Sequence, residues 1–210
     1  MLVVVDYEAG NLRSVAKALE QVGVRPTVNE DAGTLLQAGA VVLPGVGASD
    51  AAMRALRQRG LVEPLREVIA RGTPFLGVCM GLELLMESTE EGEEPCLGVV
   101  AGRVRRLPEG LKVPHMGWNS VELRQSHPVF AGVPQGSHFY FVHSYYAQPQ
   151  DPSCVLGTTT YGVPFCSVLA RGNLVATQFH PEKSGPLGLK VYENFARFAF
   201  DWQSERARRG

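Results

Sequence analysis

The N-terminal half of the sequence alternates continuous apolar runs with segments whose apolar residues recur at helical spacing. The apolar runs lie at 2–6, 27–28, 40–43 and 74–78. The helical patterns lie at 12–22, 50–59 and 61–69. Apolar strands that alternate with amphipathic helices are typical of a mainly parallel sheet with helices on both faces. We therefore expect an α/β fold with a doubly wound sheet, in which ligands bind at the carboxyl ends of the strands.

Beyond residue 90 the pattern changes to short β-rich runs. These runs lie at 97–105, 119–123, 138–146, 154–160, 165–170 and 174–179, and a last helix follows Pro186. Short strands in succession predict antiparallel β extensions in the C-terminal half. The 210 residues contain no internal repeat and no obvious boundary, so we expect a single domain over 1–210.

The composition excludes several classes of protein. An apolar fraction of 45% and a formal net charge of −1 are those of an ordinary globular protein, and they give no general attraction to nucleic acid. The opening segment MLVVVDY is too short for a signal peptide and lacks its basic residues, and no later run approaches membrane-spanning length. We expect a cytoplasmic protein with neither a nucleic-acid partner nor a membrane partner.

The four cysteines are widely separated and form no CxxC pair, which argues against a disulfide framework and against a zinc site. We expect no metal site. Three of the cysteines, Cys96, Cys154 and Cys166, are expected to be small buried hydrophobes in strands. Cys79 has a different setting, because it follows an apolar run directly and stands between small residues.

The segment GVCMG at 77–81 has the form of a nucleophile elbow, in which a nucleophile occupies a tight strand-to-helix turn. At a helix N-terminus the dipole and the free amides favour a thiolate, and they lower a cysteine pKa from about 8.5 into the range of roughly 3.5–7.5. The amide of Met80 would be the first oxyanion donor, and a second would come from a strand-end loop such as PGVG at 44–47. The same pattern also fits a cysteine that merely occupies a crowded turn.

A thiolate that attacks an amide needs a group to protonate the leaving amine. Among the five histidines, His180 ends an apolar strand and is followed two residues later by Glu182. Residues i and i+2 of an extended segment share a face, so the carboxylate would fix the tautomer of the imidazole and stabilise its charged form. His115 and His143 lie in aromatic or glycine-containing segments, and their roles stay open.

Three segments together resemble the class I (triad) glutamine amidotransferases, and the match runs through almost the whole chain. They are GVCMGLELL at 77–85, TQFHPEKSG at 177–185 and PGVG at 44–47. Within that class, the segments DYEAGNLRSV, VPHMGWN and YFVHSYY are similar to the family of glutaminase subunits of imidazole glycerol phosphate synthase, which serves histidine biosynthesis. The CLGHQ segment of the anthranilate and carbamoyl-phosphate branches is absent, and so is the GTCAG of the pyridoxal-phosphate branch.

The resemblance implies that the chain hydrolyses L-glutamine to glutamate and ammonia through a γ-glutamyl thioester on Cys79. His180 would act as acid and base, and Glu182 would orient it. In the family the ammonia passes to a cyclase subunit with a (β/α)8 barrel, which forms imidazole glycerol phosphate and an aminoimidazole carboxamide ribotide. No cofactor is implied. The chain has no phosphate loop or nucleotide fingerprint of its own, so a separate synthase subunit is expected, in a heterodimer.

The resemblance also assigns the residues around the substrate. The amides of Val46 and Met80 would form the oxyanion hole, and the glutamine pocket would be lined by Gly47, Glu83, Ser144 and Tyr145. At the position of Glu83 the family commonly has glutamine, and an ionised carboxylate there would repel the α-carboxylate of the substrate. The alternative for Glu83 is a solvated residue in the first turns of a helix.

A further set of residues resembles the family's contact surface with the cyclase. The set comprises Asn11, Trp118, Asn119, Tyr140 and Lys183. For Trp118 and Tyr140 the alternative is ordinary core packing. Two alternatives concern the chain as a whole: an interaction subunit without catalysis, and a glutaminase subunit of another ammonia-using synthase. Glutamine-dependent synthesis with a cyclase separates them.

Overall fold

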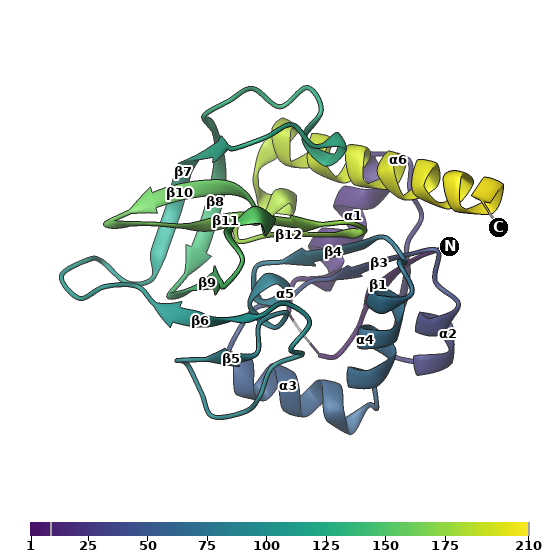
Figure 1. Cartoon of the computed structure of the whole chain (residues 1–210), viewed down its shortest axis with the longest axis horizontal. Coiled ribbons are helices and arrows are strands. Elements are labelled where there is room, and N and C mark those ends of the chain that lie inside the picture. The colour runs from purple at the N-terminus through teal and green to yellow at the C-terminus, as the bar shows by residue number, and fades with distance from the viewer. Residues whose placement is uncertain (9, 210) are drawn as a thin grey trace.

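The computed structural model describes residues 1–8 and 10–209, which form helices and two sheets (Figure 1). The α-helices are α1 (Leu12–Gln21), α2 (Ala32–Leu36), α3 (Ser49–Gln58), α4 (Val62–Ala70), α5 (Met80–Glu83) and α6 (Gly185–Arg209). The strands are β1 (Leu2–Val5), β2 (Thr27–Asn29), β3 (Ala40–Leu43), β4 (Phe75–Val78), β5 (Ser88–Thr89), β6 (Gly102–Arg106), β7 (His115–Leu123), β8 (Ser137–His143), β9 (Tyr145–Pro149), β10 (Val155–Tyr161), β11 (Val163–Arg171) and β12 (Leu174–Thr177).

The larger sheet has nine strands in the order β2-β1-β3-β4-β12-β11-β10-β7-β8. The strands from β2 to β12 are parallel to one another, and from β11 onwards the neighbours are antiparallel. The smaller sheet has the order β5-β6-β9. This arrangement confirms the expected α/β class, a mainly parallel doubly wound sheet with antiparallel extensions. The extensions reach out on one side of the molecule in Figure 1.

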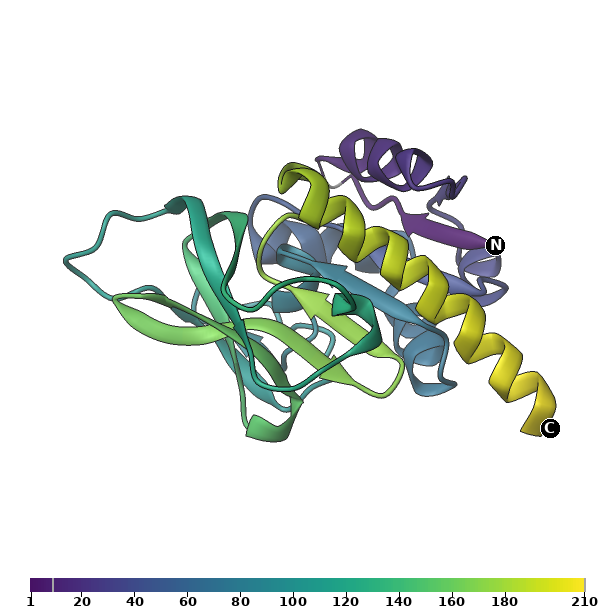
Figure 2. The same cartoon turned by 90° about the horizontal axis from the view of Figure 1, so that it is seen from above.

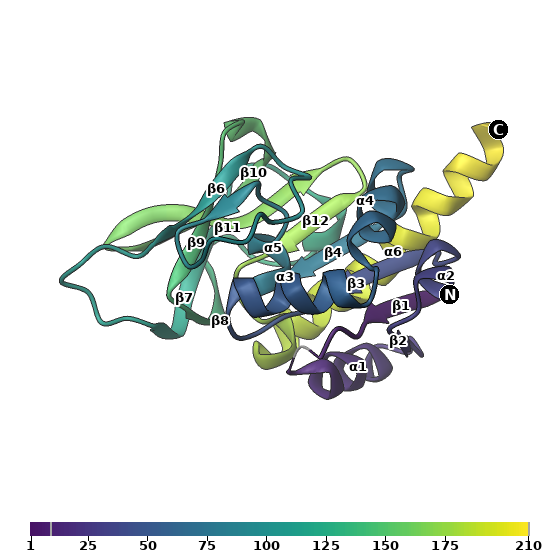
Figure 3. The same ribbon diagram turned by 90° about the horizontal axis from the view of Figure 1, so that it is seen from below.

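Helices cover both faces of the parallel strands. Helices α1 and α6 lie together on one face, seen from above in Figure 2, whereas α3 and α4 lie over the other, seen from below in Figure 3. Successive residues of a strand point to opposite faces, and β4 follows this rule: Phe75 packs in one core cluster, and Leu76 and Val78 pack in the other. Both faces of β1, β3 and β4 are therefore buried, which explains why these strands are apolar throughout, whereas the edge strand β2 is partly exposed.

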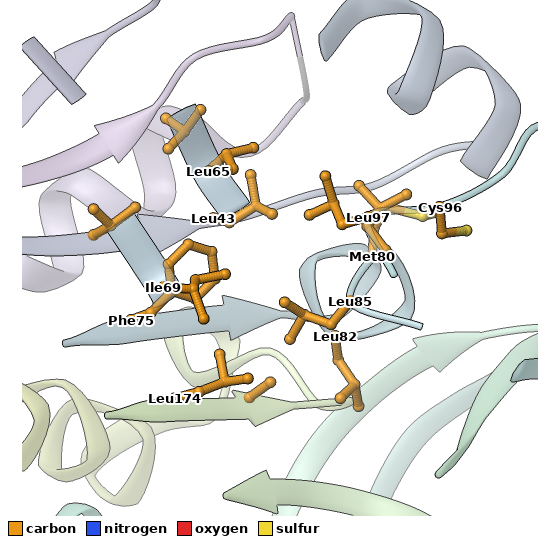
Figure 4. Packing of buried hydrophobic residues seen from close by; sticks show 14 of the residues in the cluster. Leu43, Leu65, Ile69, Phe75, Met80, Leu82, Leu85, Cys96, Leu97 and Leu174 are labelled. Atoms are coloured by element: carbon orange, nitrogen blue, oxygen red, sulfur yellow. The ribbon is translucent and has the colours of Figure 1, made fainter. Parts of the chain in front are cut away.

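The core on the α4 side joins the sheet to the turn that carries Cys79. Figure 4 shows Phe75 of β4 and Leu174 of β12 beside Ile69 of α4, with Met80 and Leu82 further along the same cluster. Each fully buried side chain of this size stabilises the fold by about 1.5–3 kcal/mol. The residues that follow Cys79 are thus held rigidly against the end of β4.

Several sequence-based boundaries were wrong in the C-terminal half. The run at 97–105 becomes a strand only at Gly102, and the run at 138–146 is interrupted at Ser144, so that β8 and β9 lie in different sheets. The run at 174–179 is antiparallel to β11, as expected, and β12 also lies parallel to β4, so it joins the parallel part of the sheet to the antiparallel part. Helix α2 was not expected; its N-terminus is capped by Asp31, whose carboxylate accepts from the Thr34 amide at 2.7 Å.

The other cysteines are buried, as expected, but only Cys166 lies in a strand. Cys154 ends the 3-10 helix Pro152–Cys154, and Cys96 lies in a loop. Over residues 1–8 and 10–209, no helix has both the length and the apolar character needed to cross a membrane.

Candidate active site

Cys79 lies between β4 and α5 in a strained backbone conformation, with φ 52° and ψ −105°. This is the backbone of a nucleophile elbow, and strain of this kind costs about 1–3 kcal/mol. Its flanking glycines are sterically required: a Cβ on Gly77 would lie 2.8 Å from the carbonyl oxygen of Gly81, and one on Gly81 would lie 2.0 Å from that of Leu43. The Cys79 amide donates to the Thr177 carbonyl at 2.7 Å, which ties the elbow to β12.

The Cys79 thiol is buried and has few polar neighbours. Its Sγ lies 3.9 Å from the Val142 carbonyl oxygen and 3.9 Å from Nε2 of Gln178. Burial raises the pKa of the thiol well above its ordinary value, and the charges of Glu83 and Glu182 raise it further, against hydrogen bonds from the Met80 backbone and Gln178. The expectation of a lowered pKa was therefore wrong for this resting state, because α5 has four residues and too small a dipole to offset burial.

His180 and Glu182 form a buried pair at the end of β12. His180 Nδ1 lies 2.7 Å from Glu182 Oε1, and the hydroxyl of Tyr192 donates to Glu182 Oε2 at 3.0 Å. The Asn11 amide also donates to Glu182. Burial alone would raise the pKa of Glu182, but the hydrogen bond and the charge of His180 hold it below its usual range. The carboxylate is thus ionised and fixes the proton of His180 on Nδ1.

The backbone that joins these two residues differs from the expected extended segment. Pro181–Lys183 forms a 3-10 helix, and this turn brings the Glu182 carboxylate back to the imidazole. The other ring nitrogen, His180 Nε2, is buried and has no hydrogen-bond partner among the described residues. Residues just before His180 contact the elbow: the Thr177 carbonyl accepts from the Cys79 amide at 2.7 Å, and Gln178 Nε2 lies 3.9 Å from the thiol. The pair therefore follows β12 at the same edge of the sheet at which Cys79 follows β4.

The PGVG loop follows β3, the parallel neighbour of β4, so it lies at the same edge of the sheet as the elbow. Gly45 is packed tightly: a Cβ there would lie 2.3 Å from the Tyr7 hydroxyl and 2.7 Å from Met80 Cβ. Val46 and Gly47 are exposed, and Gly47 has φ 101° with open space around its Cα. The loop is therefore anchored beside the elbow at Gly45 and free of side-chain packing at Gly47.

Glu83 is buried, with 4% of its surface exposed, so the alternative of a solvated residue was wrong. Its Oε1 accepts from Gln178 Nε2 at 2.7 Å. Burial raises the pKa of Glu83 to about 8; the Gln178 hydrogen bond lowers it, and the charge of Glu91 raises it. At neutral pH this side chain is mostly a neutral acid, close in shape and polarity to the glutamine that the resemblance leads one to expect here.

Ser144 and Tyr145 lie at the corner between β8 and β9, and both are partly exposed. The Ser144 carbonyl accepts from the Leu107 amide at 3.0 Å, and the Tyr145 carbonyl lies 2.7 Å from His143 Nδ1. Because the Val142 carbonyl approaches the Cys79 thiol, this corner borders the elbow.

The residues expected at a partner surface lie in two places. Trp118 and Tyr140 are cross-strand partners on β7 and β8, with ring centroids 6.1 Å apart, and Trp118 is 56% exposed, so core packing was the wrong alternative for it. Asn119 is half-buried and donates to the Thr160 carbonyl at 3.0 Å, and Lys183 is exposed. Asn11 instead lies beside Glu182.

Sequence reasoning missed Gln178 and Tyr192. Gln178 contacts both Glu83 and the thiol, and its only signal was its place two residues before His180. Tyr192 lies on the apolar face of α6, where a buried hydroxyl requires a polar partner, and that requirement could have indicated its role. No three His, Cys, Asp or Glu side chains within the described ranges are grouped so that they could hold a metal ion.

Comparison with known proteins agrees with this geometry. A model of the family glutamine amidotransferase class-I matches residues 3–198. The chain is 51% identical over 200 residues to the imidazole glycerol phosphate synthase subunit HisH of Dehalococcoides mccartyi (strain CBDB1), covering 95% of this chain and 98% of the relative. It is 53% identical over 201 residues to the subunit HisH of Synechococcus sp. (strain JA-3-3Ab), covering 94% and 93%.

Solved structures share the fold. A crystal structure of a glutamine amidotransferase superposes with a TM-score of 0.75 at 22% identity, covering 94% of this chain and 98% of that one. The structure of PurLQS from Thermotoga maritima gives a TM-score of 0.73 at 18% identity, covering 94% and 97%. The chain belongs to the class-I glutamine amidotransferase family.

Proposed function

We propose that this chain hydrolyses L-glutamine to glutamate and ammonia, and that it is the glutaminase subunit of an imidazole glycerol phosphate synthase. The observation that carries the proposal is the strained cysteine elbow at the end of β4, beside the buried His180–Glu182 pair. The identity of about half over nearly the whole length with subunits named HisH supports the pathway, which is histidine biosynthesis.

The chemistry proceeds in two steps. Cys79 Sγ attacks the side-chain amide carbon of glutamine while its proton passes to His180 Nε2, the ring nitrogen that has no hydrogen-bond partner over residues 1–8 and 10–209. The tetrahedral intermediate collapses to a γ-glutamyl thioester, and His180 returns the proton to the leaving ammonia. Water, activated by His180, then hydrolyses the thioester to glutamate. Glu182 holds the imidazole in the required tautomer throughout, and Tyr192 and Asn11 hold Glu182.

The Met80 and Val46 amides are proposed to stabilise the oxyanion, because both belong to segments at this edge of the sheet. The neutral acid of Glu83 is proposed to donate to the α-carboxylate of glutamine in place of an amide. Gly47, Ser144 and Tyr145 complete the proposed pocket.

The partner is proposed to be a cyclase subunit with a (β/α)8 barrel, which receives the ammonia. The surface proposed for it includes the exposed Trp118 and Lys183, together with the half-buried Tyr140, Asn119 and Asn11. On this proposal residues 1–210 work as one domain, without a cofactor, in the cytoplasm.

The test is to mix the purified chain with a cyclase subunit and its nucleotide substrate and to follow imidazole glycerol phosphate. We expect synthesis with glutamine that is lost in Cys79→Ala, whereas both preparations use ammonium salt equally. A chain that hydrolyses glutamine but supports no synthesis would serve another synthase. A chain that binds the cyclase and hydrolyses no glutamine would refute the enzymatic proposal.

A further inference from the structure

Two buried histidines outside the proposed triad face each other across β7 and β8. His115 and His143 are cross-strand partners, 4% and 5% exposed, and His115 Nδ1 lies 2.9 Å from His143 Nε2. Aromatic rings enclose both of them: Tyr161 stacks on His115 with centroids 4.0 Å apart, and Phe165 packs against His143 at 5.1 Å. Buried polar rings need hydrogen bonds, so their arrangement has to satisfy every ring nitrogen.

One set of proton positions does so. The Tyr145 carbonyl can only accept, so His143 Nδ1, at 2.7 Å, carries a hydrogen. In a neutral ring, His143 Nε2 then accepts, and His115 Nδ1 donates to it. His115 Nε2 in turn accepts from the Asn119 amide at 3.4 Å. Burial lowers the pKa of His115 and lowers that of His143 to about 3, so both rings are neutral near pH 7.

The chain of hydrogen bonds therefore runs in one direction, from Asn119 through His115 and His143 to the Tyr145 carbonyl. It ends at the β8–β9 corner, residues 142–145. That corner carries the Val142 carbonyl, which lies 3.9 Å from the Cys79 thiol. The His180 amide donates to the Tyr140 carbonyl at 2.9 Å, so the proposed base is tied to β8, the strand that carries His143.

We propose that His143, oriented by His115, is a positioning residue for glutamine turnover, which fixes the β8–β9 corner against the Cys79 thiol through the Tyr145 carbonyl. The inference rests on the proposed function, because the corner matters through the glutamine held beside the thiol. His143 itself touches neither the substrate nor the reacting atoms. Its effect depends on one donor, Nδ1–H, and that donor is what an experiment has to remove.

The matched variants are His143→Asn and His143→Leu. The two new side chains have nearly the same shape, but only asparagine presents an N–H near the position of Nδ1. We expect His143→Leu to lower kcat/KM for glutamine on the order of 10²-fold, the loss typical of a displacement of about 1 Å. His143→Asn should recover at least about tenfold of that loss, and synthesis from ammonium salt should equal wild type in both variants.

Phe165→Leu is the packing control, because its ring contacts His143 without any hydrogen bond to the corner. We expect it to lower Tm while kcat/KM stays within about threefold of wild type. Equal kcat/KM for the Asn and Leu variants would overturn the proposal, and so would an equal loss in Phe165→Leu. If His143→Leu does not fold, the variants His115→Asn and His115→Leu are compared in the same way, because His115 is one hydrogen bond further from the Tyr145 carbonyl.

A second readout separates this inference from the proposed function. The rate at which iodoacetamide alkylates Cys79 reports the surroundings of the thiol even if no glutamine is hydrolysed. We expect a different rate in His143→Leu and a rate near wild type in His143→Asn. A wild-type chain without glutaminase activity in the presence of the cyclase and its nucleotide substrate refutes the proposed function, whereas identical alkylation rates in both variants refute the positioning role.

Discussion

Replacing Glu83 with glutamine removes the carboxyl group of the proposed pocket while keeping the shape of the side chain. Glutamine retains an Oε1 acceptor for Gln178, whose Nε2 lies 2.7 Å from the present carboxyl oxygen. The titratable groups whose charges act on or respond to Glu83 are Tyr7, Cys79, Glu91 and Cys96. None of them is a cation, so an ionised Glu83 has no opposite charge among them to stabilise it.

The size of the effect follows from the pKa. Burial raises the pKa of Glu83 from its ordinary value of 4.5 to about 8. Each pKa unit corresponds to about 1.4 kcal/mol, so the folded chain disfavours the ionised acid by about 5 kcal/mol. Between about pH 4.5 and pH 8 the folded chain keeps a proton that the unfolded chain has lost. Stability therefore falls as pH rises through this window and levels off above it.

Glu83→Gln has no such proton, so the variant should be the more stable of the two by a margin that grows with pH. A gain of 1 kcal/mol raises Tm by about 2–4 °C in a chain of this size. We expect little difference in Tm near pH 5 and a difference on the order of 10 °C above pH 8. Scanning calorimetry across this pH range measures the difference in Tm. Glu109 is exposed, so Glu109→Gln serves as the control and should show the same dependence of Tm on pH as wild type.

Catalysis should follow the same titration. Below about pH 8 the protonated Glu83 donates to the α-carboxylate of glutamine, and above it the ionised acid repels that carboxylate. The KM of wild type should therefore rise with pH, whereas the KM of Glu83→Gln should be lower and independent of pH. The kcat values of the two proteins should differ little, because the contact acts on the ground state and the transition state alike. If KM and Tm depend on pH in the same way in both proteins, the raised pKa of the buried Glu83 and its proposed contact with the α-carboxylate of glutamine are both refuted.

Four further changes test other parts of the site. Cys79→Ala should abolish glutamine-dependent synthesis and spare ammonium-dependent synthesis; equal loss of both would contradict the division of labour between subunits. Tyr192→Phe removes the 3.0 Å hydrogen bond to Glu182, worth about 1.5–3 kcal/mol to a charged acceptor, so kcat should fall on the order of tenfold in steady-state assays. Gly47→Ala disfavours φ 101° by about 1–2 kcal/mol without introducing a clash. The affinity for the cyclase, measured by titration calorimetry, should stay the same, but the rise in glutaminase kcat on adding the cyclase should be smaller than in wild type. An isolated wild-type chain as fast as the complex would refute the idea that the cyclase activates the chain through this loop. Trp118→Ala should weaken the complex on the order of tenfold or more in titration calorimetry, with Tm unchanged, because its ring is 56% exposed in the free chain.

The sequence predicted the N-terminal strands and the helices α1, α3 and α4 because continuous apolar runs alternate there with segments of helical periodicity. It could not place β12, whose apolar run LVAT resembles the other buried strands and carries no information on its neighbours in the sheet. It also missed the interruption at Ser144, because the aromatic residues on either side continue the β pattern. Helix α2 has only five residues, too few for a periodic signal.

In the site, the residues found from the sequence are those whose signal is local. Cys79 lies in a compact glycine motif, and His180 and Glu182 are two residues apart. Gln178 acts on Glu83 across 95 residues of sequence, and Tyr192 reaches Glu182 from another helix, so neither contact can be seen before the chain is folded. The burial of Glu83 is equally a product of tertiary packing, and it converts a residue that looked repulsive into a neutral donor near pH 7.

The raised pKa of the Cys79 thiol determines the order of events in the proposed reaction. Burial and the charge of Glu182 oppose an isolated negative charge on Cys79, so the thiol stays neutral until its proton has a destination. Within the part of the chain that the structure describes, His180 Nε2 has no hydrogen-bond partner, so it can take that proton. Once it does, the same Glu182 that opposed the thiolate stabilises the imidazolium through the 2.7 Å contact at Nδ1. In the proposed reaction, ionisation of Cys79 is therefore coupled to the transfer of its proton to His180 Nε2.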